Sequence, residues 1–242
     1  MLLEARNISK AFGSFHAVRG ADLTVTPGEL IGLIGPNGAG KSTFFNCLAG
    51  DTLPSGGTVT FDGTDLTTAS AEAHARAGIG RTFQVPATFE DMTVLENVMV
   101  GAFLRHPHRN EARDRALDVI ELTGMTELRA TRARSLGTPG RKRLEIARVL
   151  ASRPRLMLLD EALAGLTPTE LHKAIELVRT IHATGVTVVI VEHIMEVIMT
   201  LAQRIIVFNQ GHVIAQGKPT EVVNDEAVIE AYLGRGHRKR RR

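Results

Sequence analysis

Apolar and polar positions follow different periods in different parts of this chain. Residues 30–34 form an apolar run of strand length, which leads through a glycine-rich loop into an apolar helical stretch at 41–49. Strand-length apolar runs return at 156–159, 186–191 and 205–208, with segments of helical spacing between them. Short apolar strands separated by amphipathic helices predict an α/β fold with a mostly parallel sheet that is covered on both faces.

The beginning and the middle of the chain follow other patterns. Before residue 30, short strand-like pieces alternate with turn signals such as Pro27-Gly28. From about residue 87 to 151 the apolar spacing is helical. There, Thr93 and Glu96 form a capping box that begins a helix. The helical part is therefore predicted to be an insertion between two halves of one α/β core.

The composition excludes several classes of protein. The chain has 242 residues, of which 43% are hydrophobic and 23% charged, as is usual for globular domains. No apolar stretch approaches the roughly 20 residues of a membrane-spanning helix, and no signal-peptide segment begins the chain. A single cysteine, Cys47, excludes an intramolecular disulfide and is typical of a reducing compartment. We therefore expect a protein of the cytosol.

The formal net charge of +3 is unevenly distributed, because residues 235–242 contain six Lys or Arg residues. A basic tail without aromatic residues between its charges is more typical of a solvated segment than of a nucleic-acid site. Attraction to anionic lipid head groups is equally compatible with it. We expect no nucleic-acid partner and assign the tail no specific role.

A glycine-rich loop follows the first buried strand and fits the pattern G-x-x-x-x-G-K-[ST]. It consists of Gly35, Pro36, Asn37, Gly38, Ala39, Gly40, Lys41 and Ser42. Its backbone N–H groups and the N-terminus of the next helix are expected to surround phosphate oxygens. Lys41 is expected to reach the β- and γ-phosphates of ATP, Ser42 to bind Mg²⁺, and Thr43 to contact the α-phosphate side. A turn that only caps a helix would not explain the lysine and the hydroxyl.

Two adjacent carboxylates follow the apolar run at 156–159. Asp160 is expected to hold Mg²⁺, because we place its strand next to the strand that leads into the glycine-rich loop (the P-loop). Glu161 is expected to polarise the attacking water as general base. An isolated acidic pair at a strand end is more often an exposed pair, but the nucleotide-binding loop earlier in the chain favours catalysis.

Two further polar residues follow predicted strands. His193 comes after 186–191 and is expected to bridge Glu161, the water and the γ-phosphate. The alternative is a histidine with only structural hydrogen bonds. Gln84, before the helical part, is expected to contact Mg²⁺ and to sense the γ-phosphate. Its alternative is an ordinary polar residue at a strand end.

In this order, the motifs resemble those of the ATP-binding subunits of ABC transporters, over essentially the whole chain. In that family's terms, 35–42 resembles the Walker A motif, Gln84 the Q-loop, 156–160 Walker B, Glu161 the catalytic glutamate and His193 the switch histidine. Phe12 matches the aromatic position that stacks on adenine, although a lone phenylalanine near a strand is usually a core residue.

The resemblance implies a P-loop NTPase (RecA-like) fold: a mostly parallel sheet, N-terminal antiparallel β elements and an inserted helical subdomain. The expected organisation is a single domain over 1–234, with a core of 1–86 and 152–234 and a helical subdomain of about 87–151. A basic tail, 235–242, follows.

The resemblance also implies a function, which is ATP hydrolysis with Mg²⁺ by a dimer at the cytoplasmic face of the inner membrane. The implied partners are membrane-spanning permease subunits, a second ATPase subunit and an extracytoplasmic solute-binding protein. Segments 80–84, 92–101, 143–148 and 227–234 most resemble the ATPases of branched-chain amino-acid importers. We therefore expect import of branched-chain or related amino acids. The alternatives are an ABC exporter ATPase, or a soluble ABC ATPase acting on nucleic acid or ribosomes.

One segment departs from the family. The signature, usually Leu-Ser-x-Gly-Gln, is replaced by Leu136-Gly137-Thr138-Pro139-Gly140. Pro139 has no N–H to offer a phosphate. Gly137 cannot replace the serine hydroxyl, and the alternative donor is the hydroxyl of Thr138, one position away. In the family's dimer this segment closes over the ATP that is bound by the other subunit. We therefore expect this chain to contribute poorly to the ATP site of its partner. We therefore favour a heterodimer with two unequal ATP sites over a homodimer.

A second departure follows Glu161. The family commonly has proline at the next position and an acidic residue or asparagine in the D-loop, where this chain has Ala162 and Thr167. Thr167, followed by Pro168 and Glu170, is expected to act chiefly as the N-cap of a helix.

Overall fold

The computed structural model describes residues 1–233, which form two sheets with helices between and around them. The basic tail predicted at 235–242 lies outside the described residues. Among the described helices, none has both the length and the apolar character that crossing a membrane requires.

The smaller sheet comes from the first 65 residues and is antiparallel. Its strands, in spatial order, are β2 (Phe15–Val25), β1 (Leu3–Phe12), β4 (Gly56–Phe61) and β5 (Thr64–Asp65). The predicted antiparallel elements are confirmed, but β1 and β2 are 10 and 11 residues long, where the sequence predicts short pieces. The pairing register of this hairpin shifts at three places, the first of which lies between Ala5 and Ile8. Each shift interrupts the alternation of apolar and polar positions.

The larger sheet is mostly parallel, as predicted. Its strands, in spatial order, are β10 (His212–Gly217), β9 (Arg204–Asn209), β3 (Leu30–Ile34), β8 (Thr187–Val191), β7 (Leu156–Asp160) and β6 (Ile79–Arg81). Only β10 runs antiparallel to its neighbour. Because β8 lies between β3 and β7, the expectation that the strand of Asp160 is the direct neighbour of the P-loop strand is wrong. The carboxyl ends of parallel strands share one edge of the sheet, so the residues after β3, β7 and β8 still meet there.

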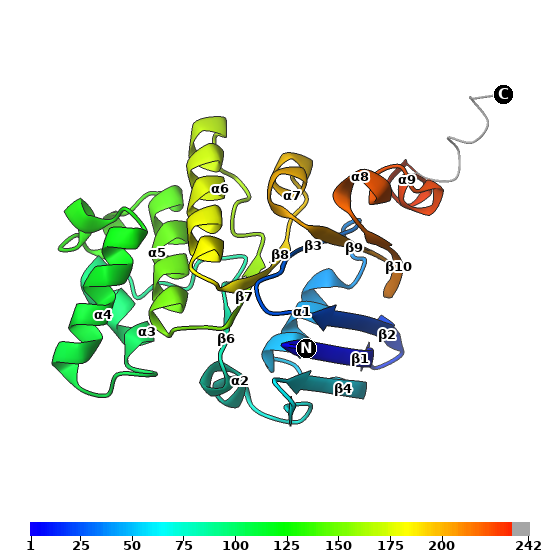
Figure 1. Ribbon diagram of the computed structural model, residues 1–242, viewed down its shortest axis with the longest axis horizontal. Coiled ribbons are helices and arrows are strands. Elements are labelled where there is room, and N and C mark those ends of the chain that lie inside the picture. Colours follow the sequence, from blue (N-terminus) through cyan, green and yellow to red (C-terminus); the bar gives the residue numbers. More distant parts are fainter. Residues whose placement is uncertain (234–242) are drawn as a thin grey trace.

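The helices lie between the sheets, on the side of the larger sheet away from the smaller one, and at one end of the molecule (Figure 1). They are α1 (Lys41–Ala49), α2 (Ala71–Ala77), α3 (Val94–Ala102), α4 (Arg109–Leu122), α5 (Thr138–Ala151), α6 (Pro168–Ala183), α7 (Met195–Leu201), α8 (Pro219–Val222) and α9 (Glu226–Leu233). Short 3₁₀ turns occupy Thr126–Leu128 and Ala133–Ser135. Figure 1 shows α3, α4 and α5 together, away from the smaller sheet. The division into a core and a helical subdomain stays a prediction.

Capping boxes begin two of these helices where the sequence predicts them. At α3, the Glu96 N–H donates to Thr93 Oγ1 at 3.2 Å, and the Thr93 N–H donates to Glu96 Oε2 at 2.8 Å. At α6, the N–H and hydroxyl of Thr167 both donate to Glu170 Oε2 at 2.8 Å. These bonds satisfy donors at the helix starts and so define where each helix begins.

The strands of the larger sheet are apolar on both faces because each face covers a separate core. Leu30 and Ile34 of β3 pack into the core under the helices that follow β6, whereas Ile31 and Leu33 pack into the core between the two sheets. The second core contains α1, which follows the glycine-rich loop. The buried strand β3 and helix α1 therefore hold the two ends of this loop in place.

Candidate nucleotide-binding site

The glycine-rich loop connects the end of β3 to the start of α1, and all three of its glycines have positive φ angles that other residues rarely adopt. Gly35 and Gly40 have φ angles of 151° and 100°. A Cβ atom would lie 2.1 Å from the carbonyl oxygen of Phe208 at Gly35, and 2.3 Å from that of Ala17 at Gly40. The loop is thus pressed against β9 and β2, which only glycine permits.

Lys41 brings a cation to this loop. Its Nζ donates to the carbonyl oxygens of Gly35 at 2.7 Å and Pro36 at 2.9 Å, and the residue is only 7% exposed. Burial lowers the pKa of Lys41, while the charges of Glu161 and Asp160 act in the opposite direction. The first turn of α1 adds backbone N–H groups without helical partners. Ammonium and helix N-terminus together make an anion-binding site.

A cavity of about 440 Å³ opens in front of the loop, within the usual range of ligand sites. Its lining consists of Phe15, Ala17, Asn37, Gly38, Ala39, Gly40, Lys41, Ser42, Thr43, Gln84, Glu161 and His193. Most of the predicted site residues are thus brought together from four segments of the chain. Gly35, Pro36 and Asp160 lie outside this lining. The first two accept hydrogen bonds from Lys41, and Asp160 is 4% exposed.

The aromatic residue at the cavity differs from the predicted one. Phe12 ends β1, is 53% exposed and does not line the cavity, and Lys10 Nζ lies 5.2 Å from its ring centroid. Phe15, the first residue of β2, lines the cavity and is 62% exposed. Sequence reasoning missed Phe15, although an aromatic residue at the same hairpin turn was a signal for it. Adenine stacking by either ring stays a prediction.

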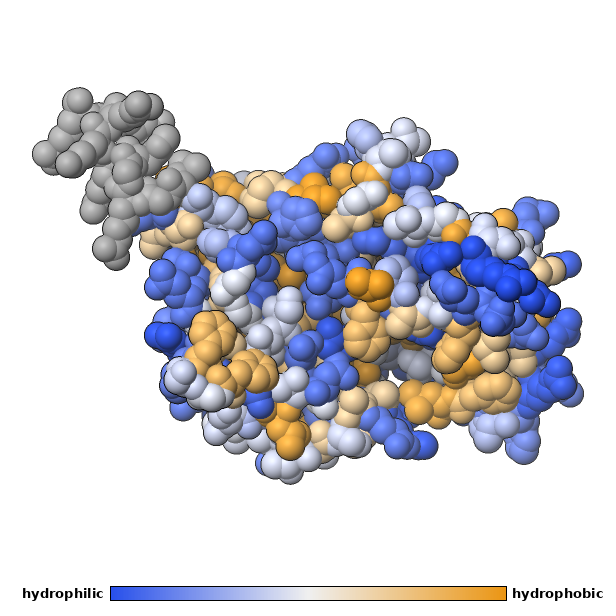
Figure 2. Space-filling model, turned by 180° about the vertical axis from the view of Figure 1, so that it is seen from behind, coloured by the Kyte–Doolittle hydropathy of each residue, from blue (hydrophilic) through white to orange (hydrophobic). Residues whose placement is uncertain are grey.

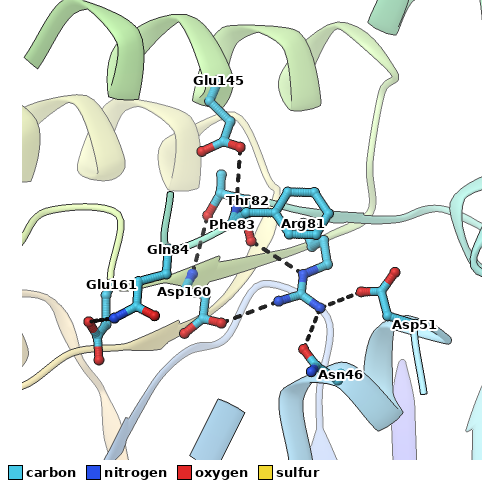
Figure 3. Close-up of polar contacts among 9 residues, drawn as sticks. All are labelled: Asn46, Asp51, Arg81, Thr82, Phe83, Gln84, Glu145, Asp160 and Glu161. Atoms are coloured by element: carbon cyan, nitrogen blue, oxygen red, sulfur yellow. Dashed lines mark hydrogen bonds and ion pairs between the residues drawn. The ribbon is translucent and has the colours of Figure 1, made fainter. Parts of the chain in front are cut away.

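Glu161 is held by contacts from β8 and from Gln84. Its φ of 47° lies in the left-handed region, which is unusual for a residue other than glycine. Its N–H donates to the carbonyl oxygen of Val191 in β8 at 3.0 Å. Gln84 Nε2 donates to Glu161 Oε2 at 2.7 Å (Figure 3). The exposed His193 lines the same cavity. The predicted base, sensor and histidine therefore share one cavity.

Asp160 has one free oxygen. Its Oδ2 accepts a hydrogen bond from Arg81 Nη2 at 3.2 Å, whereas its buried Oδ1 has no hydrogen-bond partner within residues 1–233. Burial raises the pKa of Asp160, and the charge of Arg81 opposes this. Mg²⁺ is usually held by one or two carboxylates together with phosphate and water oxygens. Asp160 Oδ1, with Ser42 and Gln84 at the cavity, fits that pattern. The described residues contain no cluster of three or more His, Cys, Asp or Glu side chains suited to a metal.

Sequence reasoning missed two buried charges on α5. Lys142 Nζ donates to the carbonyl oxygens of Glu161 at 3.0 Å and Ala164 at 2.7 Å. Glu145 Oε1 accepts the N–H groups of Phe83 at 3.3 Å and Ala87 at 3.2 Å, on both sides of Gln84. Charged residues at i and i+3 of an amphipathic helix usually lie in solvent, so the sequence alone carried no signal for these contacts.

The chain is similar to known proteins along nearly its whole length. Residues 18–164 match a family model described as ABC transporter, and residues 212–238 match one described as branched-chain amino acid ATP-binding cassette transporter. The chain is 39% identical to the high-affinity branched-chain amino acid transport ATP-binding protein LivG of Escherichia coli (strain K12), over 96% of this chain and 98% of that protein. It is 36% identical to the lipopolysaccharide export system ATP-binding protein LptB of the same strain, over 98% of both.

Solved structures agree with the fold. A nucleotide-free ATP-binding cassette from an ABC transporter matches with a TM-score of 0.88 and 30% identity, over 96% of this chain and 99% of that one. A dimeric ATP-binding cassette in a post-hydrolysis state, bound to ADP and Pi, matches with a TM-score of 0.81 and 26% identity, over 90% and 98%. The predicted P-loop NTPase fold class is confirmed.

Proposed function

This chain belongs to the ATP-binding cassette family of ABC transporters and is an ATPase, and from that premise we propose that it powers the import of branched-chain or related amino acids. One observation carries the proposal. Residues 212–238, beyond the part that matches the general ABC transporter model, match a model of branched-chain amino acid cassettes. The identity to LivG over nearly both full lengths supports the same cargo class.

The proposed partners are membrane-spanning permease subunits at the cytoplasmic face of the inner membrane, a second ATPase subunit and an extracytoplasmic solute-binding protein. A second cavity, of about 360 Å³, supports a permease contact. Its lining comes from α1, α2, β6, α3 and α5 and the loops beside them, with Phe83, Phe89, Arg81 and Arg148 among its residues. On the face shown in Figure 2, apolar side chains border a hollow. We assign this cavity to a permease segment with apolar side chains.

The residues of the first cavity have distinct proposed roles in hydrolysis. Lys41 and the loop N–H groups bind the β- and γ-phosphates and keep the γ-phosphate in position. Ser42 and Gln84, with Asp160 beside the cavity, would hold Mg²⁺, which would supply positive charge to these phosphates. Glu161 accepts a proton from the attacking water, and Gln84 orients the Glu161 carboxylate through their 2.7 Å hydrogen bond. His193 contacts the γ-phosphate from the end of β8.

An exporter ATPase is the second candidate, because LptB, an export-system protein, is 36% identical over 98% of this chain. In this proposal the direction of transport is a property of the membrane subunits. The two candidates therefore differ in their partners rather than in Lys41 or Glu161.

The test is purification of the tagged chain from gently solubilised membranes, with its partners identified by mass spectrometry. The complex is then reconstituted, and its ATP hydrolysis is measured with leucine, isoleucine or valine and the co-purified binding protein. We expect the amino acids to stimulate hydrolysis and to enter the vesicles.

The control complex carries Lys41→Ala, which should lower hydrolysis roughly 100-fold or more because it removes a charge that stabilises the transition state. Co-purification of export components, with stimulation by lipid and none by amino acids, would favour the second candidate. Recovery only with ribosomes or nucleic acid would refute both.

A further inference from the structure

Arg81, the last residue of β6, contacts the carboxylate that we assign to Mg²⁺ (Figure 3). Its Nη2 donates to Asp160 Oδ2 at 3.2 Å. The two side chains are 10% and 6% exposed, so solvent and salt screen this ion pair little. Asp160 Oδ1 is buried and has no hydrogen-bond partner in the described part of the chain. The ion pair thus occupies one carboxylate oxygen and leaves the other for the metal.

The guanidinium of Arg81 is itself held from several sides. Its Nη1 donates to Asn46 Oδ1 at 2.7 Å and pairs with Asp51, which lie at and just beyond the C-terminal end of α1. Its Nε donates to the carbonyl oxygen of Thr82 at 3.3 Å, and its Cζ lies 4.7 Å from the centroid of the Phe83 ring. Because these contacts already order the planar group, little further freedom is lost when it binds a carboxylate.

Among the described residues, Arg81 makes the only side-chain hydrogen bond to the Asp160 carboxylate. The backbone of Asp160 is fixed separately, since its N–H donates to Thr82 Oγ1 at 3.2 Å. Without Arg81, the strand end would stay in place, but the carboxylate could rotate and Oδ2 would be buried without a donor.

We propose that Arg81 is a positioning residue for the Mg²⁺ site, which fixes the Asp160 carboxylate so that Oδ1 stays available to the metal. The proposal rests on the Mg²⁺ role proposed above for Asp160 and does not depend on the transported cargo. Arg81 is expected to set the affinity for Mg²⁺ in the nucleotide complex and to leave metal-free nucleotide binding unchanged.

The experiment measures the binding of a fluorescent ATP analogue to the purified chain, first with EDTA and then over a Mg²⁺ titration. For Arg81→Met we expect metal-free affinity within about twofold of wild type. The Mg²⁺ concentration for half-maximal effect should rise roughly tenfold or more, as is typical when the partner of a metal ligand is lost. Mn²⁺, followed by electron paramagnetic resonance with ATP present, should show the same weakening. Arg81→Lys, which keeps a donor, should recover part of the metal affinity.

Arg155→Met is the matched control. Arg155 also pairs with a carboxylate, Asp62, and lies 5.7 Å from an aromatic ring, that of Phe61, but it does not contact Asp160. The Arg155→Met variant should leave the Mg²⁺ dependence unchanged. Its melting temperature shows what the loss of a more exposed ion pair costs. If both Arg81 variants lose nucleotide affinity equally with and without Mg²⁺, the contact is only structural and the proposal is overturned. An unchanged Mg²⁺ dependence in both variants would overturn it as well. Asp160→Asn separates the two ideas: if it too leaves the Mg²⁺ dependence unchanged, the metal role of Asp160 fails as well.

Discussion

At the scale of single residues, the site depends on a strained position that a buried cation supports. Glu161 has a left-handed backbone, and Lys142 donates to its carbonyl oxygen and to that of Ala164, at the two ends of the turn after β7. Burial lowers the pKa of Lys142, while the charges of Glu192, Glu145 and Glu161 oppose this. Lys142 therefore fixes the backbone from which the proposed base projects.

Lys142→Met should lower ATP hydrolysis roughly tenfold and leave nucleotide binding within about twofold, because it releases the backbone of Glu161 and spares the P-loop. The loss of hydrogen bonds from a charged donor should also reduce the free energy of unfolding by about 1–3 kcal/mol. Steady-state hydrolysis, nucleotide binding and thermal unfolding measure these effects. Lys173→Met, the same change at an exposed position of α6, is the control. Glu161→Gln is the reference, since it removes the base itself. Equal loss of binding and hydrolysis in Lys142→Met would contradict this role.

At the scale of elements, α3 and α5 pack so closely that one helix has a glycine where they meet. A Cβ atom at Gly101 of α3 would lie 1.9 Å from the carbonyl oxygen of Arg148 in α5. Arg148 in turn donates to the carbonyl oxygen of Ala87, and its guanidinium lies 5.4 Å from the Phe89 ring centroid. The contact between the two helices therefore also supports one wall of the second cavity.

Gly101→Ala should destabilise the protein, although alanine usually stabilises a helix by about 1 kcal/mol relative to glycine. Here the added methyl must push the helices apart, and overpacking costs about 1–3 kcal/mol. We expect the melting temperature to fall by about 2–8 °C in thermal unfolding. Gly56→Ala is the control, because no heavy atom lies closer than 4.0 Å to a Cβ there. A higher melting temperature for Gly101→Ala would show that α3 and α5 separate at no cost.

At the scale of the whole molecule, a dimer of such cassettes would use two surfaces of this chain, the ATP cavity and the segment in place of the signature. Only the first keeps the residues expected of the family. Most of the predicted site residues line the cavity of this chain, whereas the segment in place of the signature begins α5 with Gly137 as N-cap and Pro139 in the first turn. Proline is well suited to that turn, since the first N–H groups of a helix have no helical partner. The same substitution removes one of the donors that α5 presents at its N-terminus. The structure thus explains why the segment folds normally and still supports the proposed heterodimer.

Purified chain without other ATPase subunits should hydrolyse ATP at least about tenfold more slowly than its complex with a second ATPase, because a donor to transition-state charge is often worth 100-fold or more. The double variant Gly137→Ser, Pro139→Gly should raise turnover of the purified chain by restoring a hydroxyl and an N–H. Hydrolysis rates per site, with subunit composition from mass measurement, decide the question. Comparable ATP turnover by the chain alone and by the complex would refute the heterodimer proposal.

The sequence by itself determined the features that depend on neighbours along the chain. These are the buried strand before the loop, the glycines and Lys41, the capping boxes at Thr93 and Thr167, and the acidic pair after β7. Each follows from local backbone geometry, since a strand period, a helix cap or a phosphate loop is contained within about ten residues.

Tertiary structure decided what depends on strand order and on distant contacts. It placed β8 between β3 and β7, brought Phe15 rather than Phe12 to the cavity, and paired Arg81 with Asp160 across 79 positions of sequence. The strand order and the pairing of Arg81 with Asp160 have no local signal. The order of parallel strands depends on the crossover connections between them. The partner of a buried charge is the oppositely charged group that the folded chain places beside it.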